Sequence, residues 1–222
     1  MIVRFLPTNT QSIVLGDVDM SVKRTTVYWT QGGKEHTDET LRIALEGAKD
    51  RNIDTVVIST STGFCGERAV EIFKGSGLKI VFVTHQTGYR QAGLQTLPPE
   101  KRAMLQQYGI VLTCTDVLAG GVDVGMARQR PEKTQPNEAA LPFILPPTNV
   151  IIANTLRLFA QGVKVCAEIA MMACDSNVIP REKQVVCVAG SSQGADTAMV
   201  VSPAESGRMR DLKMMEILCK PL

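Results

Sequence analysis

The chain has 222 residues, of which 44% are hydrophobic and 21% are charged, and its formal net charge is +2 at pH 7. This length and composition suit one globular domain with a substantial core. Basic and acidic residues are interspersed and aromatic residues make up only 5% of the chain, which argues against a surface for nucleic acid or lipid. We therefore expect a small molecule as the partner.

The six cysteines include no C-x-x-C pair, and most of them lie within apolar runs. This pattern is typical of reduced core thiols and predicts neither a disulfide framework nor a metal site. No apolar run approaches the ~18 residues of a membrane span, and the first apolar segment is short for a signal peptide. We expect a cytoplasmic protein.

Residues 1–24 contain two short apolar patches and are interpreted as an N-terminal extension, either an extra strand pair or an ordered arm. From Thr25 the pattern becomes regular, because the run TTVYWT is rich in β-formers and predicts a strand. Thr37 is a candidate N-cap for the helix that follows. The apolar stripe of this helix is expected at Leu41, Ala44, Leu45 and Ala48.

The run DTVVIST over residues 54–60 is continuously apolar or β-branched, which predicts a strand buried on both faces. A polar turn over Ser61–Gly66 follows it, and then a helix over Glu67–Lys74. This order directs free N–H groups and the helix dipole at a bound anion, although the hydroxyls could equally cap the helix. Cys65 lies at a helix start, where a thiol pKa can fall, but no His or second Cys lies nearby in the sequence to activate it.

The alternation of strands and helices then repeats. A third strand is expected over LKIVFVTH (78–85), a helix from Pro98 or Pro99 to Gly109, and a fourth strand over IVLTCTDV (110–117). Four strands separated by helical patterns predict βαβ units in a mainly parallel, doubly wound sheet.

The segment Gly120–Asn149 interrupts this rhythm with prolines, glycines and charges. It is interpreted as an insertion that serves as a lid, a subunit arm or an exposed excursion without a chemical role. Val150–Cys174 is then strongly helical, with a break expected at Gly162.

That long helical segment is apolar nearly all round, so we expect it in the core or at a subunit contact, and we expect a homo-oligomer. Glu168 is one of its few charged residues. Because Lys164 precedes it by one turn, Glu168 is interpreted either as one half of a local ion pair or as a carboxylate that faces a ligand.

The stretch Gln184–Ala204 consists of an apolar strand, the glycine-containing loop Gly190–Thr197 and a second apolar strand. Two glycines four positions apart let the backbone turn sharply and approach a ligand. The loop is interpreted as one wall of a ligand site or as a plain hairpin connection. Hydroxyls able to bond phosphate oxygens are those of Ser191, Ser192 and Thr197. A last strand is predicted over Met214–Pro221.

Several stretches resemble the C-terminal α/β domain of pyruvate kinase, which in that enzyme holds the allosteric sugar-phosphate effector rather than the catalytic site. They are LRIALEGAKDRN leading into DTVVISTSTG, LKIVFVTH, and VVCVAG with AMVVSPA. The motifs THQTGY, GVKVCAEIAMMACDSNVIP and AGSSQGADTAMVVSPA are more similar to a small family of standalone proteins of this fold in archaea and some bacteria. The resemblance covers residues 25–222. It implies a three-layer, doubly wound α/β sheet with an antiparallel edge strand, and it implies an FMN site.

The chain also departs from these relatives. A pyruvate kinase needs a catalytic barrel of ~250 residues, for which this chain has no room, so we do not expect transfer of a phosphoryl group from phosphoenolpyruvate. The Gly120–Asn149 segment looks longer and more proline-rich than the family pattern, and the arginines expected for a sugar bisphosphate are not evident in Gly190–Thr197.

In a pyruvate-kinase-like strand order, the strand that ends at Ser59 and Thr60 lies beside the strand that ends at Gly190, and both loops face one crevice. The phosphate is expected at the first loop with help from the second, and the flavin ring near His85. His85 is interpreted as a hydrogen-bond donor to a flavin carbonyl or as a structural partner. The predicted ligand-binding residues are Ser59, Thr60, Ser61, Thr62, Gly63, His85, Gln86, Thr87, Gly88, Tyr89, Gly190, Ser191, Ser192, Gly194, Asp196 and Thr197.

The first hypothesis for function is a small-molecule-binding protein that holds a phosphorylated ligand, FMN by resemblance. A second is a flavin-dependent oxidoreductase with His85 or Tyr89 as proton donor, although no nicotinamide-binding fingerprint is present. A third is a regulatory subunit that senses a phosphosugar. Whether the chain is an enzyme stays open at this point.

Overall fold

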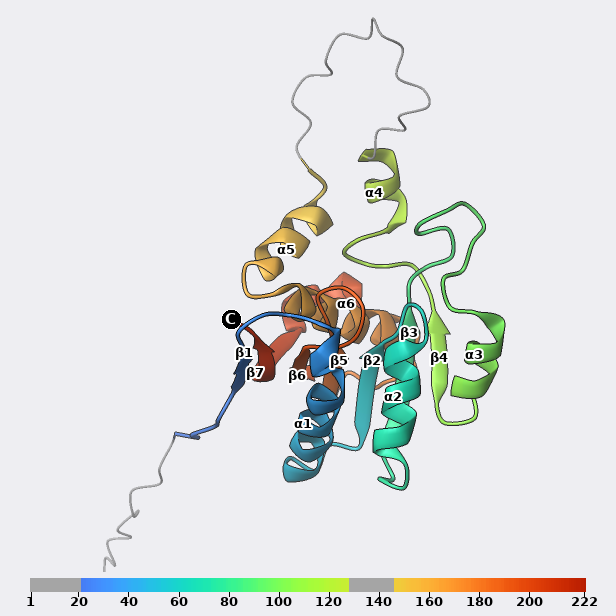
Figure 1. The fold of residues 1–222 in the computed structure, drawn as a ribbon. Helices are drawn as coiled ribbons and strands as arrows, with labels where there is room; N and C mark the ends of the chain where they lie inside the picture. The colour runs from blue at the N-terminus through green and yellow to red at the C-terminus, as the bar shows by residue number, and fades with distance from the viewer. Residues whose placement is uncertain (1–20, 128–145) are drawn as a thin grey trace, which may run out of the picture.

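A seven-stranded sheet with helices on both faces forms the centre of the part of the chain that the computed structural model describes, residues 21–127 and 146–222 (Figure 1). Its strands are β1 (Val27–Trp29), β2 (Thr55–Ser59), β3 (Lys79–Thr84), β4 (Ile110–Thr113), β5 (Val185–Ala189), β6 (Thr197–Ser202) and β7 (Lys213–Pro221). The helices are α1 (Thr37–Asp50), α2 (Phe64–Phe73), α3 (Pro99–Leu105), α4 (Gly121–Ala127), α5 (Thr148–Arg157) and α6 (Gln161–Asp175), with 3-10 helices η1 (Lys34–His36) and η3 (Ser206–Asp211).

The strand order is β1-β7-β6-β5-β2-β3-β4, and every neighbouring pair is parallel except the two pairs that β6 makes with β5 and β7. The predicted doubly wound, mostly parallel α/β sheet is thereby confirmed. The antiparallel strand expected at one edge is β6. After β6 the chain reverses through η3 and returns as β7, and β1 pairs with β7. These two strands extend the sheet beyond β6.

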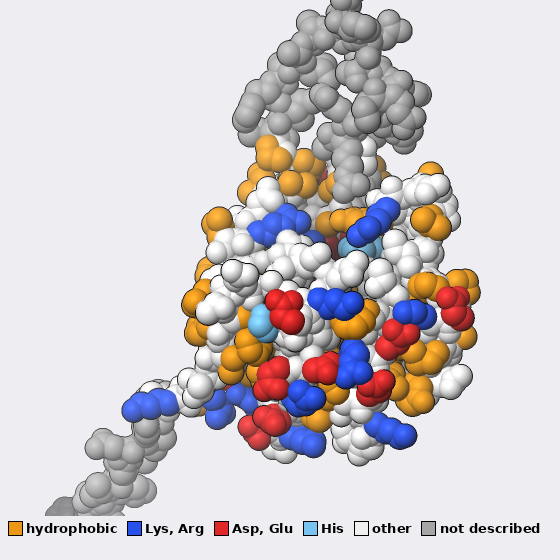
Figure 2. Space-filling view, viewed as in Figure 1, with side chains coloured by type: hydrophobic (Ala, Val, Ile, Leu, Met, Phe, Trp, Pro, Cys, Tyr) orange, Lys and Arg blue, Asp and Glu red, His pale blue; other side chains and the backbone are white. Residues whose placement is uncertain are grey.

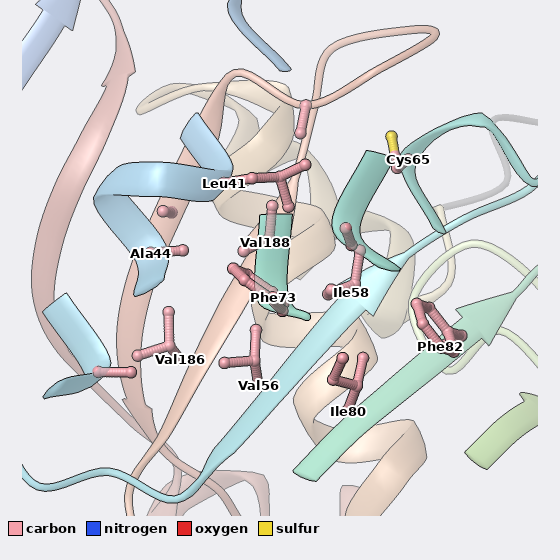
Figure 3. Packing of buried hydrophobic residues seen from close by; sticks show 14 of the residues in the cluster. Leu41, Ala44, Val56, Ile58, Cys65, Phe73, Ile80, Phe82, Val186 and Val188 are labelled. Carbon is pink, nitrogen blue, oxygen red and sulfur yellow. The ribbon is translucent and has the colours of Figure 1, made fainter. Parts of the chain in front are cut away.

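Both faces of the sheet are buried, as the β-branched run before residue 60 predicts. Val56 and Ile58 of β2 point into the core beneath α1 and α2, where they pack with Leu41 and Phe73 (Figure 3). The residue between them, Val57, points to the opposite face and packs against α6. Successive side chains of a strand alternate between faces, so one apolar run serves two cores.

The second helix starts three residues earlier than predicted, at Phe64. Gly63 is its N-cap and has φ +93°, a left-handed conformation that glycine adopts without steric cost. The first helix also begins differently, because η1 runs directly into it and His36 occupies the N-cap position. Thr37 is therefore the first residue of the helix and not its cap.

The predicted helix 150–174 is two helices, α5 and α6, and the chain turns at residues 158–160 before Gly162. Gly162 lies inside the first turn of α6, where an added Cβ would approach the Thr197 Oγ1 to 2.1 Å. The glycine therefore permits close contact between helix and strand. One side of α6 packs on the sheet, and Met171 on another side packs with Leu118 and Ala153, so its burial in the core is confirmed. The homo-oligomer stays a prediction.

The proposed insertion at 120–149 begins with α4 and ends with the first residues of α5. Its residues 128–145 lie outside the described residues, as do residues 1–20 of the proposed N-terminal extension. The boundaries of these two segments as structural units stay predictions.

The cysteines, the surface charges and the helices can each be compared with what the composition predicts. All six cysteines are free thiols, five of them buried and Cys114 partly so, which confirms the prediction of core thiols. Acidic and basic side chains are interspersed over α1 and α2 on the face in Figure 2. None of the helices within residues 21–127 and 146–222 combines the length and apolar character needed to cross a bilayer.

Candidate functional site

The candidate site lies at the carboxyl edge of the sheet, where β2 and β5 are adjacent and parallel. After β2 the chain continues through α2 to β3 on one side, and after β5 it continues to β6 on the other side. A crevice at such a switch point is where open α/β sheets bind ligands. The prediction that the loops after β2 and β5 lie side by side is confirmed. The Cys65 thiol after β2 interacts with the backbone of Gly194 after β5.

The loop after β2 contains one capping residue and two hydroxyls on its outer side. Thr60 is buried, and its Oγ1 accepts a hydrogen bond of 3.1 Å from the Gly66 N–H near the start of α2. The buried Thr60, just before the predicted turn, thus caps the helix, and the capping interpretation does not hold for the hydroxyls of the turn itself. Ser61 is half-buried and Thr62 is exposed. Among the described residues, neither hydroxyl makes a hydrogen bond, so both remain available to a ligand.

The loop after β5 is held from inside by Asp196. The Oδ2 of this buried carboxylate accepts the N–H groups of Ser191 at 3.1 Å and Gly33 at 3.2 Å, and Oδ1 accepts the Thr197 hydroxyl at 2.8 Å. The prediction that Asp196 and Thr197 bind the ligand is corrected, because their polar atoms are used within the protein. Ser191 and Ser192 remain exposed at the surface of the loop.

Two lysines that sequence reasoning missed border the loop after β2. Lys34 places its Nζ 4.0 Å from the centroid of the Phe64 ring at the start of α2, and its Cα lies 2.7 Å from the position of an added Cβ on Gly194. Lys101 of α3 packs over Gly63, and its Nζ pairs with Glu67 at 2.9 Å. Both lysines reach the loop through tertiary contacts, which no local sequence pattern indicates.

His85, directly after β3, is held by Asp116 from the loop after β4. The distance from His85 Nδ1 to Asp116 Oδ2 is 2.8 Å, and Asp116 Oδ1 accepts the Gln86 N–H at 3.1 Å. The imidazole also stacks on Tyr89, with the ring centroids 4.0 Å apart. His85 therefore has a structural partner, and its role as a hydrogen-bond donor to a flavin carbonyl stays a prediction. Asp116 was missed because the fourth strand was predicted to run to Val117, whereas β4 ends at Thr113.

An open hollow of about 490 Å³ lies where β3 and β4 end. Two predicted residues, Gln86 and Thr87, line it, whereas the other lining residues come from the β4 loop and the start of α4. The residues that line it are Gln86, Thr87, Thr113, Cys114, Thr115, Gly121 and Val122. None of these side chains carries a charge at neutral pH.

Glu168 supports the same edge from beneath. Its Oε2 pairs with the buried Lys164 ammonium, and its Oε1 accepts the N–H groups of Leu118 and Ala119, both at 2.8 Å. The local ion-pair interpretation is correct, and the alternative of a carboxylate that faces a ligand is not. The pair fixes the backbone of the loop that carries Asp116.

Cys65 is not activated by its position at a helix start. Burial raises the pKa of its thiol to about 12, which outweighs the lowering expected from a helix N-terminus. The thiol is therefore protonated at neutral pH, and the structure gives it no role as a nucleophile.

The predicted site residues thus separate into two groups by burial. The buried ones are Thr60, Gly63, Asp196 and Thr197. Those exposed or half-buried at the carboxyl edge are Ser59, Ser61, Thr62, His85, Gln86, Thr87, Gly88, Tyr89, Gly190, Ser191, Ser192 and Gly194.

No family model matches the chain. Solved structures similar to it include a pyruvate kinase from Cryptosporidium parvum, at 15% identity and a TM-score of 0.37, over 76% of this chain and 23% of that protein. Two further structures of pyruvate kinase from this organism match at 16% and 17% identity, with TM-scores of 0.31 and 0.32, over 69% and 74% of this chain; the second is a complex with ADP. The chain spans 20–23% of the length of these proteins, and similarity at this level identifies neither a ligand nor an activity for it.

Proposed function

We propose that the chain binds a phosphorylated small molecule, FMN, in the crevice at the carboxyl ends of β2 and β5. The observation that carries the proposal is the parallel pairing of these two strands, which places two hydroxyl-bearing loops at one switch point. Ser61, Thr62, Ser191 and Ser192 provide exposed or half-buried hydroxyls there.

Positive charge near these hydroxyls supports a phosphate as the group that they bind. Lys34 and Lys101 both contact the turn after β2, and the N-terminus of α2 contributes its dipole at the same place. Ser59, at the end of β2, and Gly190 and Gly194 would complete the backbone around the phosphate. Lys34 and Lys101 are the cations that the loop Gly190–Thr197 itself lacks.

The ring system of FMN would lie along the same edge, toward the loop after β3, since β3 is the next strand beside β2. Residues 85–89 are the ones that would contact it. A bound flavin supplies reversible transfer of electrons and hydride, while the residues of this chain would bind and orient it.

Titration with FMN and with riboflavin, which lacks the phosphate, tests the proposal through the quenching of flavin fluorescence. Charge-assisted hydrogen bonds contribute about 1.5–3 kcal/mol each, so we expect FMN to bind at least about tenfold more tightly. The double variant Ser61→Ala, Ser192→Ala should weaken binding of FMN about tenfold and leave that of riboflavin unchanged. Ser202→Ala, at the opposite edge of the sheet, is the matched control. No binding, or equal binding of the two flavins, would disprove the proposal.

A flavin-dependent oxidoreductase is the second candidate, and the pairing of His85 with a buried carboxylate favours it because an oriented imidazole can deliver a proton. Under anaerobic conditions NADH or NADPH should then bleach the bound flavin. Persistence of the oxidised spectrum across a panel of electron donors would contradict this candidate.

A regulatory subunit that senses a phosphosugar is the third candidate, and the exposed hydroxyls beside Lys34 favour it because they suit any phosphate ester. It requires a protein partner. A pull-down that returns only the chain itself would rule it out.

For the compartment we propose the cytoplasm, since all six thiols are free.

A further inference from the structure

The pairing of His85 with Asp116 has the geometry of a proton-transfer group. Asp116 is 1% exposed, whereas the His85 side chain is 31% exposed, so a buried carboxylate holds an accessible imidazole. The contact joins Nδ1 to Asp116 Oδ2 at 2.8 Å. A carboxylate in this position selects the tautomer with hydrogen on Nδ1, which leaves the lone pair on Nε2.

Both partners are fixed by the backbone around them. The His85 carbonyl accepts hydrogen bonds from Thr84 Oγ1 and Gln95 Nε2, each at 3.0 Å. Asp116 is connected to the same loop twice more, because its Oδ1 accepts the Gln86 N–H and its own N–H donates to Gln86 Oε1 at 3.2 Å. Catalytic bases need such support, since small displacements of a reacting group lower the rate steeply.

The hollow of about 490 Å³ lies beside this pair. Gln86, which exchanges two hydrogen bonds with Asp116, is one of its described lining residues, whereas His85 and Asp116 are not among them. The described residues of its lining offer hydroxyl, thiol and amide groups and include no charged side chain. Such a lining suits an uncharged ligand that carries hydroxyl or carbonyl groups. The phosphate subsite, in contrast, is bordered by Lys34 and Lys101.

We propose that His85 and Asp116 form a proton-transfer site for an uncharged hydroxyl- or carbonyl-bearing molecule bound in this hollow. Nε2 of His85 accepts a proton from an O–H or activated C–H group of the ligand or from water, Asp116 balances the charge of the imidazolium, and the proton then returns to the product or to solvent. The step needs no flavin, so it does not depend on the function proposed above.

The tautomer is tested by long-range ¹H–¹⁵N NMR on the full chain. The chain has two histidines, and His36 is the internal reference because its side chain is 24% exposed, close to the value for His85. We expect His85 to carry its hydrogen on Nδ1 and to lose this preference in Asp116→Asn, while the His36 signals stay unchanged. Hydrogen on Nε2 of His85 in the wild-type protein at pH 8 would overturn the proposal.

The reactivity is tested with p-nitrophenyl acetate, a small uncharged ester. Nε2 takes a proton from water, the water oxygen bonds to the ester carbonyl carbon, and the bond to p-nitrophenolate breaks. The products are acetate, p-nitrophenolate and two protons, one released from Nε2 and one from the acetic acid, and both protons go to solvent. Base catalysis contributes roughly 10²–10⁴ in rate, so we expect His85→Gln to lose at least about tenfold of the activity. His36→Gln should retain it.

Asp116→Asn should lower the hydrolysis rate in the same direction as His85→Gln. If this variant does not fold, the tautomer of the wild-type protein and the rate of His85→Gln still decide the question. Equal rates for the wild type, His85→Gln and His36→Gln would overturn the proposal. Binding of FMN by Ser61→Ala, Ser192→Ala is a separate readout, so failure of one proposal does not imply failure of the other.

Discussion

Three buried carboxylates organise the loops at the carboxyl edge. Asp116, Glu168 and Asp196 are 1%, 4% and 1% exposed, and each accepts at least one backbone N–H from a loop at that edge. A buried carboxylate is tolerated when its oxygens are hydrogen-bonded, and the loop amides that it satisfies would otherwise need water. Acidic side chains near this edge therefore shape the loops, while the hydroxyls of Ser61, Thr62, Ser191 and Ser192 are exposed or half-buried at its surface.

Removal of the Asp196 carboxylate should destabilise the protein. Asp196→Ala leaves the N–H groups of Ser191 and Gly33 and the Thr197 hydroxyl without their acceptor. The Thr197 hydroxyl is buried, whereas the two N–H groups are only partly buried. At about 1–3 kcal/mol for a buried donor left unsatisfied, we expect a loss of about 2 kcal/mol or more in the free energy of unfolding, measured by urea denaturation. Asp50→Ala, at an exposed position on α1, is the control and should change it by less than about 0.5 kcal/mol. Similar values for the two variants would contradict the role of Asp196.

At the scale of elements, α6 shows why an almost wholly apolar helix need not indicate a subunit contact. The sheet covers one side of α6, and Leu118 and Ala153 pack against Met171 on another. Its first turn approaches β6 so closely that only glycine fits at position 162, where Thr197 lies opposite. The burial of α6 is thus explained within one chain.

Gly162→Ala should destabilise the protein although alanine favours helix by about 1 kcal/mol over glycine. The added Cβ would lie 2.1 Å from Thr197 Oγ1 and 2.4 Å from Thr197 Cβ, so the helix or strand must shift. We expect a net loss of roughly 1–3 kcal/mol, as for other overpacked positions, measured by thermal and urea unfolding.

Gly125→Ala in α4 is the matched control for this substitution. An added Cβ at Gly125 meets no heavy atom of the described residues within 4 Å, so only the gain in helix propensity of up to about 1 kcal/mol applies. A stabilising effect of Gly162→Ala would show that the contact between α6 and β6 is looser than described.

At the scale of the whole molecule, the sheet is most deeply buried at its centre and exposed at its two outer strands. All residues of β5 are buried, whereas Val27 and Tyr28 of β1 and Ile110 of β4 are exposed. The proposed ligand crevice lies at the ends of the central strands β2 and β5, so a rigid part of the fold supports it.

Hydrogen exchange should follow this gradient. We expect the amides of β2, β3 and β5 to exchange slowest, with opening free energies close to that of global unfolding, and those of β1 and β4 to exchange fastest among the strands. Exchange mass spectrometry on peptides measures the order. If the amides of β1 exchange as slowly as those of β5, the outer strand is covered, as it would be in the predicted homo-oligomer.

The amino-acid sequence by itself determined the elements and their layering. The β-branched run before Thr60 marks a strand buried on both faces, the stripe of Leu41, Ala44 and Ala48 marks α1, and their alternation along the chain implies a parallel sheet, because periodicity is a local property. The resemblance of the loops after β2 and β5 to ligand-binding turns is also a local property, so the sequence indicated it as well.

Only the tertiary structure decided which polar groups of those loops are free. The Gly33 N–H reaches Asp196 across 163 positions, and His85 reaches Asp116 across 31. Such pairings depend on the order of strands in the sheet, which the local pattern does not encode. Burial in the folded chain, and not residue type, therefore separates the structural Asp196 from the exposed Ser192 four positions before it in the same loop. A polar atom bonded inside the protein has nothing left to offer a ligand.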